Sequence, residues 1–409
     1  MTKPSIITGL DIGSGTTKLL TASKRREGEE IEVLSKVQEP SFGVRKGMVI
    51  DPNKLAEIIN SLITKAEEDC GQKIKEVNAS VGGSHIFSQT SHGLVSVSRA
   101  DQKISEEDIS RVLQAAQTFS LPSNKEILEI FPKEFIVDGE KEIKDPLGMN
   151  GVRLEVKATV VAGFSPYLKN SSQAILNSGI SLLNLTPAPL ASARGVLTPR
   201  ERELGVLLVD IGAGTTNLCI FEEENLIHLA IFSIGSGNIT NDIAICLKTD
   251  IDTAEKIKIQ FGNCFSAKKG KKFQKKEKIK IEGLDSEEPL FFTNKMLVQI
   301  IEARVVEILR EVQKELKKIG KAGLLPAGIV LTGGGARLPN IKDFCKKYLQ
   351  LPCRIGLAPG FSPELDDPSF ASVAGLVLEG FDSVKEKGSS IGPKGIFDKI
   401  KRAFRIFIP

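Results

Sequence analysis

Two copies of one glycine-rich motif, about 200 residues apart, contain the residues of this chain best suited to chemistry. The first copy spans Asp11 to Lys18 and the second spans Asp210 to Asn217. In both copies an apolar run ends in an aspartate, and two glycines and two threonines follow. Because glycine has no Cβ, a hairpin of this composition can bring backbone N–H groups against phosphate oxygens. We expect two facing hairpins that grip phosphates from both sides, with the aspartates near the accompanying metal.

A third motif supports this interpretation. One copy alone would be an ordinary β-hairpin, whereas two copies indicate a duplicated fold. Residues 329–337 form an apolar strand that runs into three glycines (Gly333, Gly334 and Gly335), which can lie flat against an adenine ring or an α-phosphate. In this order the three motifs resemble the actin-like ATPase superfamily, which includes actin, MreB, ParM, sugar kinases and DnaK-type chaperones. The resemblance implies an α/β fold in which a duplicated ribonuclease-H-type unit forms two lobes around a nucleotide cleft.

The composition limits the other functional classes. The chain has 409 residues, enough for two sizeable cores, and 41% of them are hydrophobic. The net charge of +4, from 55 basic and 51 acidic residues, lacks the bias of a nucleic-acid-binding protein. The six cysteines stand singly, which predicts reduced, mostly buried thiols in a cytoplasmic protein, and the three histidines form no metal-spaced cluster. We expect neither a signal peptide nor a membrane-spanning segment.

Hydrophobic periodicity and turn residues predict the order of elements. Two strands surround the first hairpin in residues 5–24, and a helix begins at Asp51-Pro52. Residues 84–164 contain strands and a helix of their own, with Ser105 as the helix N-cap and Asp108 at the third helical position, so they predict an inserted domain. Further helices are expected at 166–179, 188–196, 253–262, 291–319 and 366–379.

A lysine-rich stretch interrupts the second half. Residues 267–280 contain eight lysines and one acidic residue. A solvated hairpin or loop is the favoured interpretation, and a docking site for an acidic partner is the alternative.

The C-terminal segment differs from the rest of the chain. Residues 381–394 are polar with Gly, Ser and Pro, which predicts a flexible linker. Residues 395–409 predict an amphipathic helix whose polar face is mostly basic. Its apolar face includes Ile396, Phe397, Ile400, Phe404 and Phe407. This arrangement is typical of an anchor that lies in an anionic membrane surface and binds reversibly, while a helix packed on its own protein is the alternative.

Beyond the nucleotide motifs, the sequence resembles the FtsA family of bacterial division proteins over nearly its whole length. The segments that carry this resemblance are 41–51, 137–139, 145–149, 151–155, 238–244 and 254–258. The family has a small α+β insert, the SHS2-like subdomain 1C, and ends in a linker and an amphipathic membrane helix. The resemblance therefore divides the chain into subdomain 1A (1–83 and 165–204), subdomain 1C (84–164), a second half with subdomains 2A and 2B (205–380, with 2B at about 240–320 and a helix near 366–380 that returns to 1A), the linker (381–394) and the membrane helix (395–409).

The same resemblance implies a function. The chain would be an ATP-binding adaptor that forms actin-like protofilaments on the cytoplasmic face of the inner membrane at the division septum. Its second half, including Arg304, would hold the C-terminal tail of FtsZ, although a plain surface role for Arg304 is equally compatible with the sequence. The insert at 84–164 would contact later division proteins.

Individual site residues follow from the family motifs. Ser14, Gly15, Thr16, Thr17 and Lys18 would contact the β- and γ-phosphates from the first hairpin, and Gly212, Gly214, Thr215 and Thr216 from the second. Asp11 and Asp210 would hold Mg²⁺, largely through its waters. Gly333, Gly334 and Gly335 would line the adenine side. Glu255 and Lys258 would reach the ribose and adenine, with a surface ion pair as the alternative.

Hydrolysis is expected to be slow. MreB-like relatives carry an acidic residue just before a Pro–hydrophobic–Ala helix, and the corresponding residues 186–191 contain no carboxylate. Without a group that orients the attacking water, phosphoryl transfer should be weak even if ATP binds tightly. In addition, Gly235-Ser236-Gly237 replaces the two adjacent glycines more usual in the family. A PilM-like adaptor of type IV pili and an MreB-like membrane filament remain the alternatives.

Overall fold

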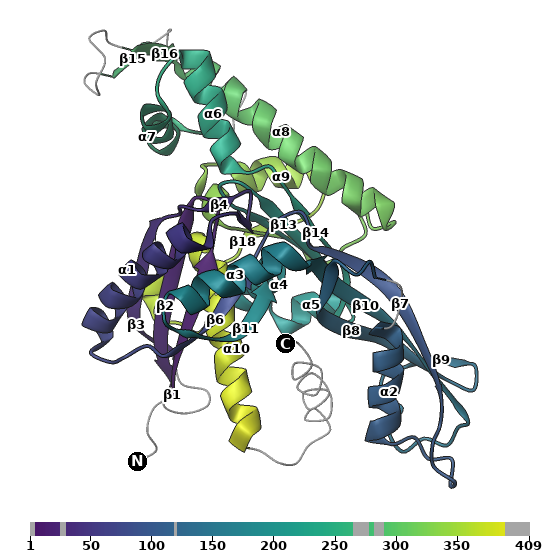
Figure 1. Cartoon of the computed structure of the whole chain (residues 1–409). Coiled ribbons are helices and arrows are strands. Elements are labelled where there is room, and N and C mark those ends of the chain that lie inside the picture. Colours follow the sequence, from purple (N-terminus) through teal and green to yellow (C-terminus); the bar gives the residue numbers. More distant parts are fainter. Residues whose placement is uncertain (1–4, 25–29, 118–120, 265–277, 282–289, 389–409) are drawn as a thin grey trace.

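The computed structural model describes residues 5–24, 30–117, 121–264, 278–281 and 290–388 (Figure 1). The lysine-rich stretch is described only at 278–281, and the segment predicted as a membrane helix lies outside the described residues. Within the described part of the chain, no helix has the length and apolar character needed to cross a bilayer.

The first lobe is built on a five-stranded sheet with the order β11-β6-β1-β2-β3. Strands β1 to β3 form an antiparallel meander, and β6 and β11 add in parallel beside β1. The strands are β1 (Ser5–Ile12), β2 (Thr16–Lys24), β3 (Glu32–Pro40), β6 (Glu76–Val81) and β11 (Ser181–Pro187), with the small hairpin β4 (Val44–Arg45) and β5 (Met48–Val49). The helices are α1 (Pro52–Cys70), α3 (Ser165–Asn177) and α4 (Ala188–Val196).

The second lobe repeats this topology. Its sheet has the order β14-β13-β12-β17-β18, again with a three-stranded meander followed by two parallel strands. The strands are β12 (Val206–Ile211), β13 (Thr216–Glu222), β14 (Asn225–Phe232), β17 (Gly328–Thr332) and β18 (Cys353–Ile355). The helices are α5 (Pro199–Leu204), α6 (Ser236–Leu247), α7 (Ile251–Phe261), α8 (Asn294–Lys318) and α9 (Ile341–Leu349). Helix α10 (Ala371–Gly388) follows them in the chain but packs against β1 and β6 of the first sheet. The equal strand orders are those of a duplicated unit.

The inserted segment forms its own sheet, with the order β7-β10-β8-β9. Its elements are β7 (Phe87–Ser96), α2 (Glu106–Gln117), β8 (Lys125–Val137), β9 (Glu140–Ile143) and β10 (Arg153–Phe164). Helix α2 begins as predicted, because Asp108 accepts from the Ser105 backbone at 2.9 Å while the Ser105 hydroxyl accepts from the Asp108 N–H at 3.3 Å. The insert projects from the side of the molecule opposite α1 (Figure 1). It has a separate apolar core between α2 and the sheet.

Two predicted boundaries differ from the structure. Residues predicted to begin the long helix at 291 instead form β16 (Leu290–Thr293), which pairs with β15 (Lys278–Ile281). The Thr293 hydroxyl then caps α8 by accepting from the Met296 N–H. Helix α10 continues to Gly388, so the segment predicted as a linker from residue 381 begins as helix, and Phe381 is buried.

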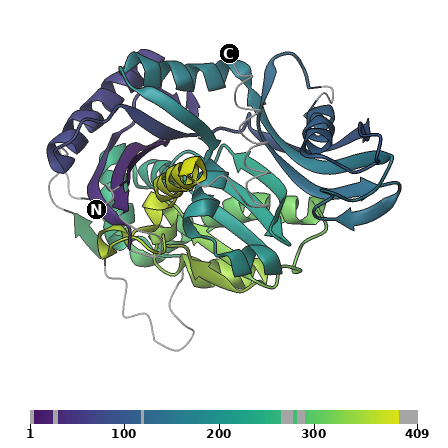
Figure 2. The same ribbon diagram turned by 90° about the horizontal axis from the view of Figure 1, so that it is seen from below.

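Helix α10 lies near the centre of the molecule, between the two lobes (Figure 2). It packs on α4 through residues with little or no side chain. A Cβ on Gly375 would lie 1.8 Å from the Ala191 carbonyl oxygen, and one on Gly195 would lie 2.1 Å from the Ala371 carbonyl oxygen. The small residues of both helices therefore allow their backbones to touch beneath the cleft described below.

Candidate nucleotide site

Between the lobes lies a cleft of about 1000 Å³. Both glycine hairpins, the starts of α6 and α10, helix α7 and the triple-glycine turn contribute to its walls. The predicted site residues that line it are Asp11, Ser14, Gly15, Thr16, Lys18, Asp210, Gly212, Gly214, Thr215, Glu255, Lys258, Gly333, Gly334 and Gly335. Motifs that are far apart in the sequence thus meet in one cavity.

The tips of the two hairpins touch each other. A Cβ on Gly15 would lie 2.7 Å from the Ala213 Cβ, and a Cβ on Gly214 would lie 2.8 Å from the Ser14 Cβ. Any larger residue at either glycine would push the tips apart. The Ser14 hydroxyl also accepts a hydrogen bond of 2.7 Å from the Gly47 backbone N–H, which ties the first tip to the β4–β5 hairpin.

Two predicted phosphate ligands, Thr17 and Thr216, do not line the cleft within the described part of the chain. The Thr17 hydroxyl lies 2.8 Å from the Ser41 hydroxyl, and Thr216 donates to the Ile234 carbonyl oxygen at 2.8 Å. Successive side chains of a strand point to opposite faces, so only every second residue after each turn can reach the cleft. In the described part of the chain these two hydroxyls therefore face away from the cleft, and their contact with phosphate stays a prediction.

Asp11 is held on one carboxylate oxygen by two hydroxyls. Ser80 on β6 donates to Oδ1 at 2.7 Å, and Ser372 on α10 donates to the same oxygen at 2.9 Å. Within the described part of the chain, no hydrogen bond reaches Oδ2. One oxygen is thus positioned and the other is available to a ligand.

Asp210 is held in the same manner. Ser192 on α4 donates to Oδ2 at 2.7 Å, and the Asn217 amide on β13 donates to it at 3.0 Å. Burial raises the pKa of the Asp210 carboxyl, and the hydrogen bonds from Ser192 and Asn217 oppose that rise. A cation beside the carboxylate would stabilise its charged form further.

The two serines come from the opposite halves of the duplicated fold. Ser372 belongs to α10, which follows the second sheet, yet it binds the aspartate of the first lobe. Ser192 belongs to α4, which follows the first sheet, yet it binds the aspartate of the second lobe. Sequence reasoning missed both serines, because the small-residue character of these helices indicated close packing but not which hydroxyl faces which carboxylate.

The residues suit a hydrated Mg²⁺ ion. Two aspartates each present an oxygen without a hydrogen-bond partner among the described residues. A Cβ on Gly333 would lie 2.2 Å from Asp210 Oδ1, so this glycine keeps the space at the second carboxylate open. Among the described residues, no cluster of three or more His, Cys, Asp or Glu is placed to enclose a metal. The two carboxylates by themselves fit Mg²⁺, which keeps several of its waters and uses one or two carboxylates beside substrate phosphates.

Glu255 and Lys258 form part of the cleft wall between α6 and α7. Lys258 donates to the Thr240 hydroxyl at 2.8 Å and pairs with Glu255 at 2.7 Å, and Thr240 also bonds to Glu255. The predicted ion pair is therefore present, but it lies in the cleft wall and not on an outer surface.

The unusual Gly235-Ser236-Gly237 segment sits directly on the second hairpin. The Ser236 and Gly237 N–H groups donate to the Gly212 and Ala213 carbonyl oxygens, both at 2.8 Å. A Cβ on Gly235 would lie 2.6 Å from the Gly212 carbonyl oxygen, and one on Gly237 would lie 2.8 Å from that of Ala213. Both glycines are thus required where the start of α6 meets the hairpin, and the serine between them lines the cleft.

Arg304 lies on α8, outside the cleft. Its guanidinium donates to both carboxylate oxygens of Asp242 on α6 at 2.7 Å, and it pairs with Glu307 at 2.6 Å. About a fifth of the side chain is exposed, at 22%. This residue therefore already joins α8 to α6.

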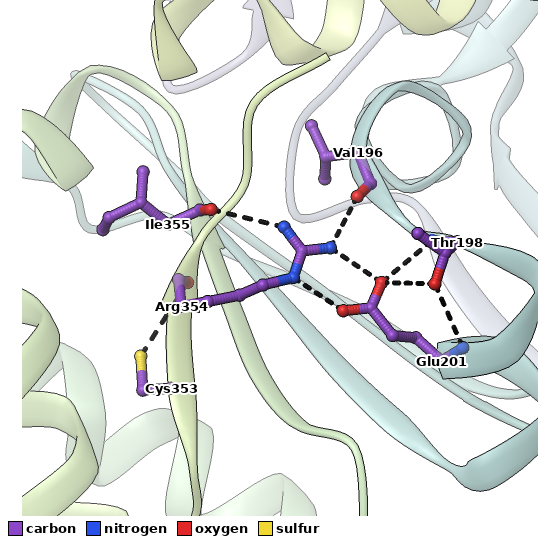
Figure 3. A network of polar contacts seen from close by, with 6 residues as sticks. All are labelled: Val196, Thr198, Glu201, Cys353, Arg354 and Ile355. Carbon is purple, nitrogen blue, oxygen red and sulfur yellow. Dashed lines mark hydrogen bonds and ion pairs between the residues drawn. The ribbon is translucent and has the colours of Figure 1, made fainter. Parts of the chain in front are cut away.

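An ion-pair network fixes the connection between the lobes (Figure 3). Arg354 on β18 donates to both oxygens of Glu201 on α5, at 2.6 and 2.7 Å, and to the Val196 carbonyl oxygen at the end of α4, at 2.8 Å. Burial opposes ionisation of Glu201, but the bonds from Arg354 and Thr198 prevail and lower its pKa. The network holds the end of α4 against the second lobe.

We expect Glu201→Gln to destabilise the fold by up to about 1 kcal/mol at pH 7, since Arg354 is partly exposed. Glutamine can still serve in the capping box with Thr198, so the substitution removes mainly the charge. The folded-state pKa of Glu201 is lowered, so its ionised carboxylate stabilises the folded state. This contribution to the free energy of unfolding is complete above the usual pKa of 4.5 and is lost as the pH falls through the folded-state pKa. Urea unfolding at pH 7 and at pH 3.5 checks this. If the difference in unfolding free energy between the variant and wild type became larger at pH 3.5, the prediction would be contradicted. Glu203→Gln, on the exposed side of α5, is the control.

Comparisons with known proteins agree with this architecture. The family model for "Cell division protein FtsA" matches residues 207–375, and the model for "SHS2 domain inserted in FTSA" matches residues 83–162. The chain is 32% identical to a cell division protein FtsA of Pseudomonas aeruginosa, over 97% of both chains. It is 33% identical to one of Borreliella burgdorferi, over 98% of both chains, and 32% identical to one of Bacillus subtilis, over 96% of this chain and 88% of that one.

Solved structures show the same fold at lower sequence identity. A PilM–PilN type IV pilus biogenesis complex gives a TM-score of 0.65 at 19% identity, covering 91% of this chain and 98% of the other. MreB5 of Spiroplasma citri bound to ADP gives 0.57 at 13% identity, covering 94% and 98%. A MamK double helical filament gives 0.51 at 12% identity, covering 92% and 98%. The predicted actin-like fold with an SHS2-type insert is thereby confirmed.

Proposed function

Because the chain belongs to the FtsA family of cell division proteins, we propose that it binds ATP and Mg²⁺, polymerises on the cytoplasmic membrane and anchors FtsZ filaments there at the septum. The observation that carries the nucleotide part is the meeting of two glycine hairpins and two aspartates in one cleft of about 1000 Å³. A cavity of that size is ample for a nucleotide.

The cleft residues suggest how ATP would be held. The backbone N–H groups of both hairpins and the Lys18 ammonium would bind the β- and γ-phosphates. Asp11 and Asp210 would hold Mg²⁺ mainly through its waters, and the ion would neutralise phosphate charge. Glu255 and Lys258 would contact the ribose and adenine, and the triple glycine would face the base.

Turnover would be slow. The carboxylates that line the described part of the cleft are Asp11, Asp210, Asp252 and Glu255. The residues before and at the start of α4 carry no carboxylate. The Thr186 hydroxyl at this position donates to the buried Glu379 side chain on α10 at 2.7 Å. No acidic group at this position would orient an attacking water, so the protein would work as an ATP-dependent binder with weak ATPase activity at most.

Self-assembly and partner binding extend the proposal. Family membership and the likeness to a MamK filament support polymerisation of this chain into actin-like filaments. We place the FtsZ tail on the lobe that carries α8. An acidic tail would have to compete with Asp242 and Glu307 for Arg304, so it would bind beside this ion pair and not through a free guanidinium. The 84–164 insert would contact later division proteins.

The membrane part rests on sequence. Residues 395–409, which lie outside the described residues, have the sequence pattern predicted to form an apolar stripe and a basic face, and they follow α10 in the chain. Each Lys or Arg near anionic lipid contributes about 1 kcal/mol, so binding of one helix would be reversible and filaments would add avidity.

Truncation after Lys394 should abolish sedimentation with liposomes of anionic lipid in the presence of ATP and Mg²⁺, while the full chain pellets with them. The reason is the loss of both the apolar stripe and its basic flank. A full-length chain with Phe397 and Phe404 replaced by serine is the matched control, since it keeps the charge. If it pellets as well as wild type, charge alone explains binding. If the full chain and the truncation both stay in solution, the anchor proposal is wrong.

The PilM-like alternative has one observation in its favour, the TM-score of 0.65. At 19% sequence identity, this likeness shows only that the two chains share a fold. The 32–33% identity to FtsA proteins over nearly the whole chain favours the division function.

A further inference from the structure

Asn217 holds a buried oxygen that has no partner among the described residues. The residue is 6% exposed and lines the cleft, and no group in the described part of the chain donates to its Oδ1. The amide orientation is fixed, because its Nδ2 donates to Asp210 Oδ2 at 3.0 Å and a carboxylate can only accept. A buried acceptor left unsatisfied costs about 1–3 kcal/mol, so a ligand that satisfied it would bind correspondingly better.

The two hairpins differ at this position. In the strand register, Asp11 lies opposite Lys18 in the first hairpin, and Asp210 lies opposite Asn217 in the second. An ammonium can face phosphate oxygens directly. An amide oxygen cannot, because two acceptors repel unless a proton or a cation lies between them. The duplicated fold thus places a phosphate-binding cation on one side and a neutral oxygen on the other.

Two carboxylates of the same cleft narrow the chemical class of ligand. Asp210 Oδ1 and Asp11 Oδ2 are also oxygens without a hydrogen-bond donor among the described residues, and both residues line the cleft together with Asn217. Carboxylate and amide oxygens in one cleft are the ligands that a hard cation prefers, directly or through water.

We propose that Asn217 Oδ1 accepts a hydrogen bond from a water in the shell of the Mg²⁺ ion that accompanies the nucleotide. Asn217 then has two roles: its N–H orients Asp210, and its oxygen holds the metal's water. This inference rests on the proposed nucleotide function and adds to it a third residue of the metal site.

The test compares two variants that act on the same carboxylate oxygen. Ser192→Ala removes one hydrogen bond to Asp210 Oδ2. Asn217→Ala removes one as well, and also removes the unpartnered oxygen. Binding of a fluorescent ATP analogue is titrated against MgCl₂ and repeated in EDTA, with thermal unfolding without nucleotide as a folding check.

Loss of an outer ligand partner raises the Mg²⁺ requirement about 10- to 100-fold. We expect the Mg²⁺ concentration needed for half-maximal binding to rise about tenfold more in Asn217→Ala than in Ser192→Ala. The affinity for the analogue measured in EDTA should change little in either variant.

Equal shifts for Asn217→Ala and Ser192→Ala would overturn the inference, since the N–H alone would then explain Asn217. Failure of the wild type to bind the analogue would instead refute the proposed function itself.

Discussion

Replacing Gly333 by alanine should weaken Mg²⁺-dependent ATP binding by about 10- to 100-fold. Gly333 has φ +83° and ψ 171°, a region that only glycine occupies without strain. The new Cβ would lie 2.2 Å from Asp210 Oδ1 and 2.6 Å from the Ile211 carbonyl oxygen. Relief of these contacts would displace the metal-facing carboxylate, and titration with a fluorescent ATP analogue measures the loss.

Gly320→Ala is the matched control for this prediction. A Cβ on Gly320, which also has a positive φ (+68°), meets no atom within 4 Å, and Gly320 does not line the described part of the cleft. Gly320→Ala should therefore bind within about threefold of wild type, which corresponds to less than 1 kcal/mol. Equal affinities for both variants would show that the space beside Asp210 is not needed for the nucleotide.

Replacing Gly375 by alanine should lower the free energy of unfolding by about 3 kcal/mol or more. In an ordinary helix the same change stabilises by about 1 kcal/mol. Here the Cβ would lie 1.8 Å from the Ala191 carbonyl oxygen and 2.9 Å from the Gly195 N, and both are backbone atoms of the packed helix α4. The two helices would have to separate, so Ser192 and Ser372 would leave their aspartates.

Chemical denaturation measures this effect, and nucleotide titration of the folded fraction tests its consequence for the site. Val384→Ala, on the exposed side of the same helix, should stay within about 0.5 kcal/mol of wild type. A Gly375→Ala protein as stable as wild type would mean that α4 and α10 do not cross at this distance.

The sequence predicted best those features that depend on neighbouring residues. The hairpins at Asp11 and Asp210 were recognised because the apolar run, the aspartate and the glycines are contiguous. Capping of the α2 helix by Ser105 and Asp108 is local in the same sense. The cleft itself followed from the duplication, since two equal motifs imply two facing lobes.

Features that depend on packing could not be predicted in this way. Ser192 and Ser372 each reach an aspartate from the other half of the chain, which no local pattern reveals. The apolar pair before Thr293 suits a helix or a strand equally, and pairing with β15 decides for the strand. Polar residues after Phe381 suggested a linker, but they have helical propensity and α10 continues through them.

The two threonines outside the cleft lining show a third limit. Thr17 and Thr216 belong to the motif, but strand alternation turns their hydroxyls away from the cleft. By the same alternation Asn217 faces the cleft, although the motif gave it no role.

The most direct test of the account is calorimetric titration of the full chain with ATP, in the presence of Mg²⁺ and again in EDTA. Our account predicts one ATP per chain, with affinity that falls when the metal is removed, and loss of the metal dependence when Asp11 and Asp210 are both replaced by asparagine. Wild-type affinity that is the same with Mg²⁺ and in EDTA, or a double variant that keeps the wild-type metal dependence, would contradict the assignment of the aspartates. Absence of binding by the wild type would contradict the nucleotide cleft, and with it the proposed function.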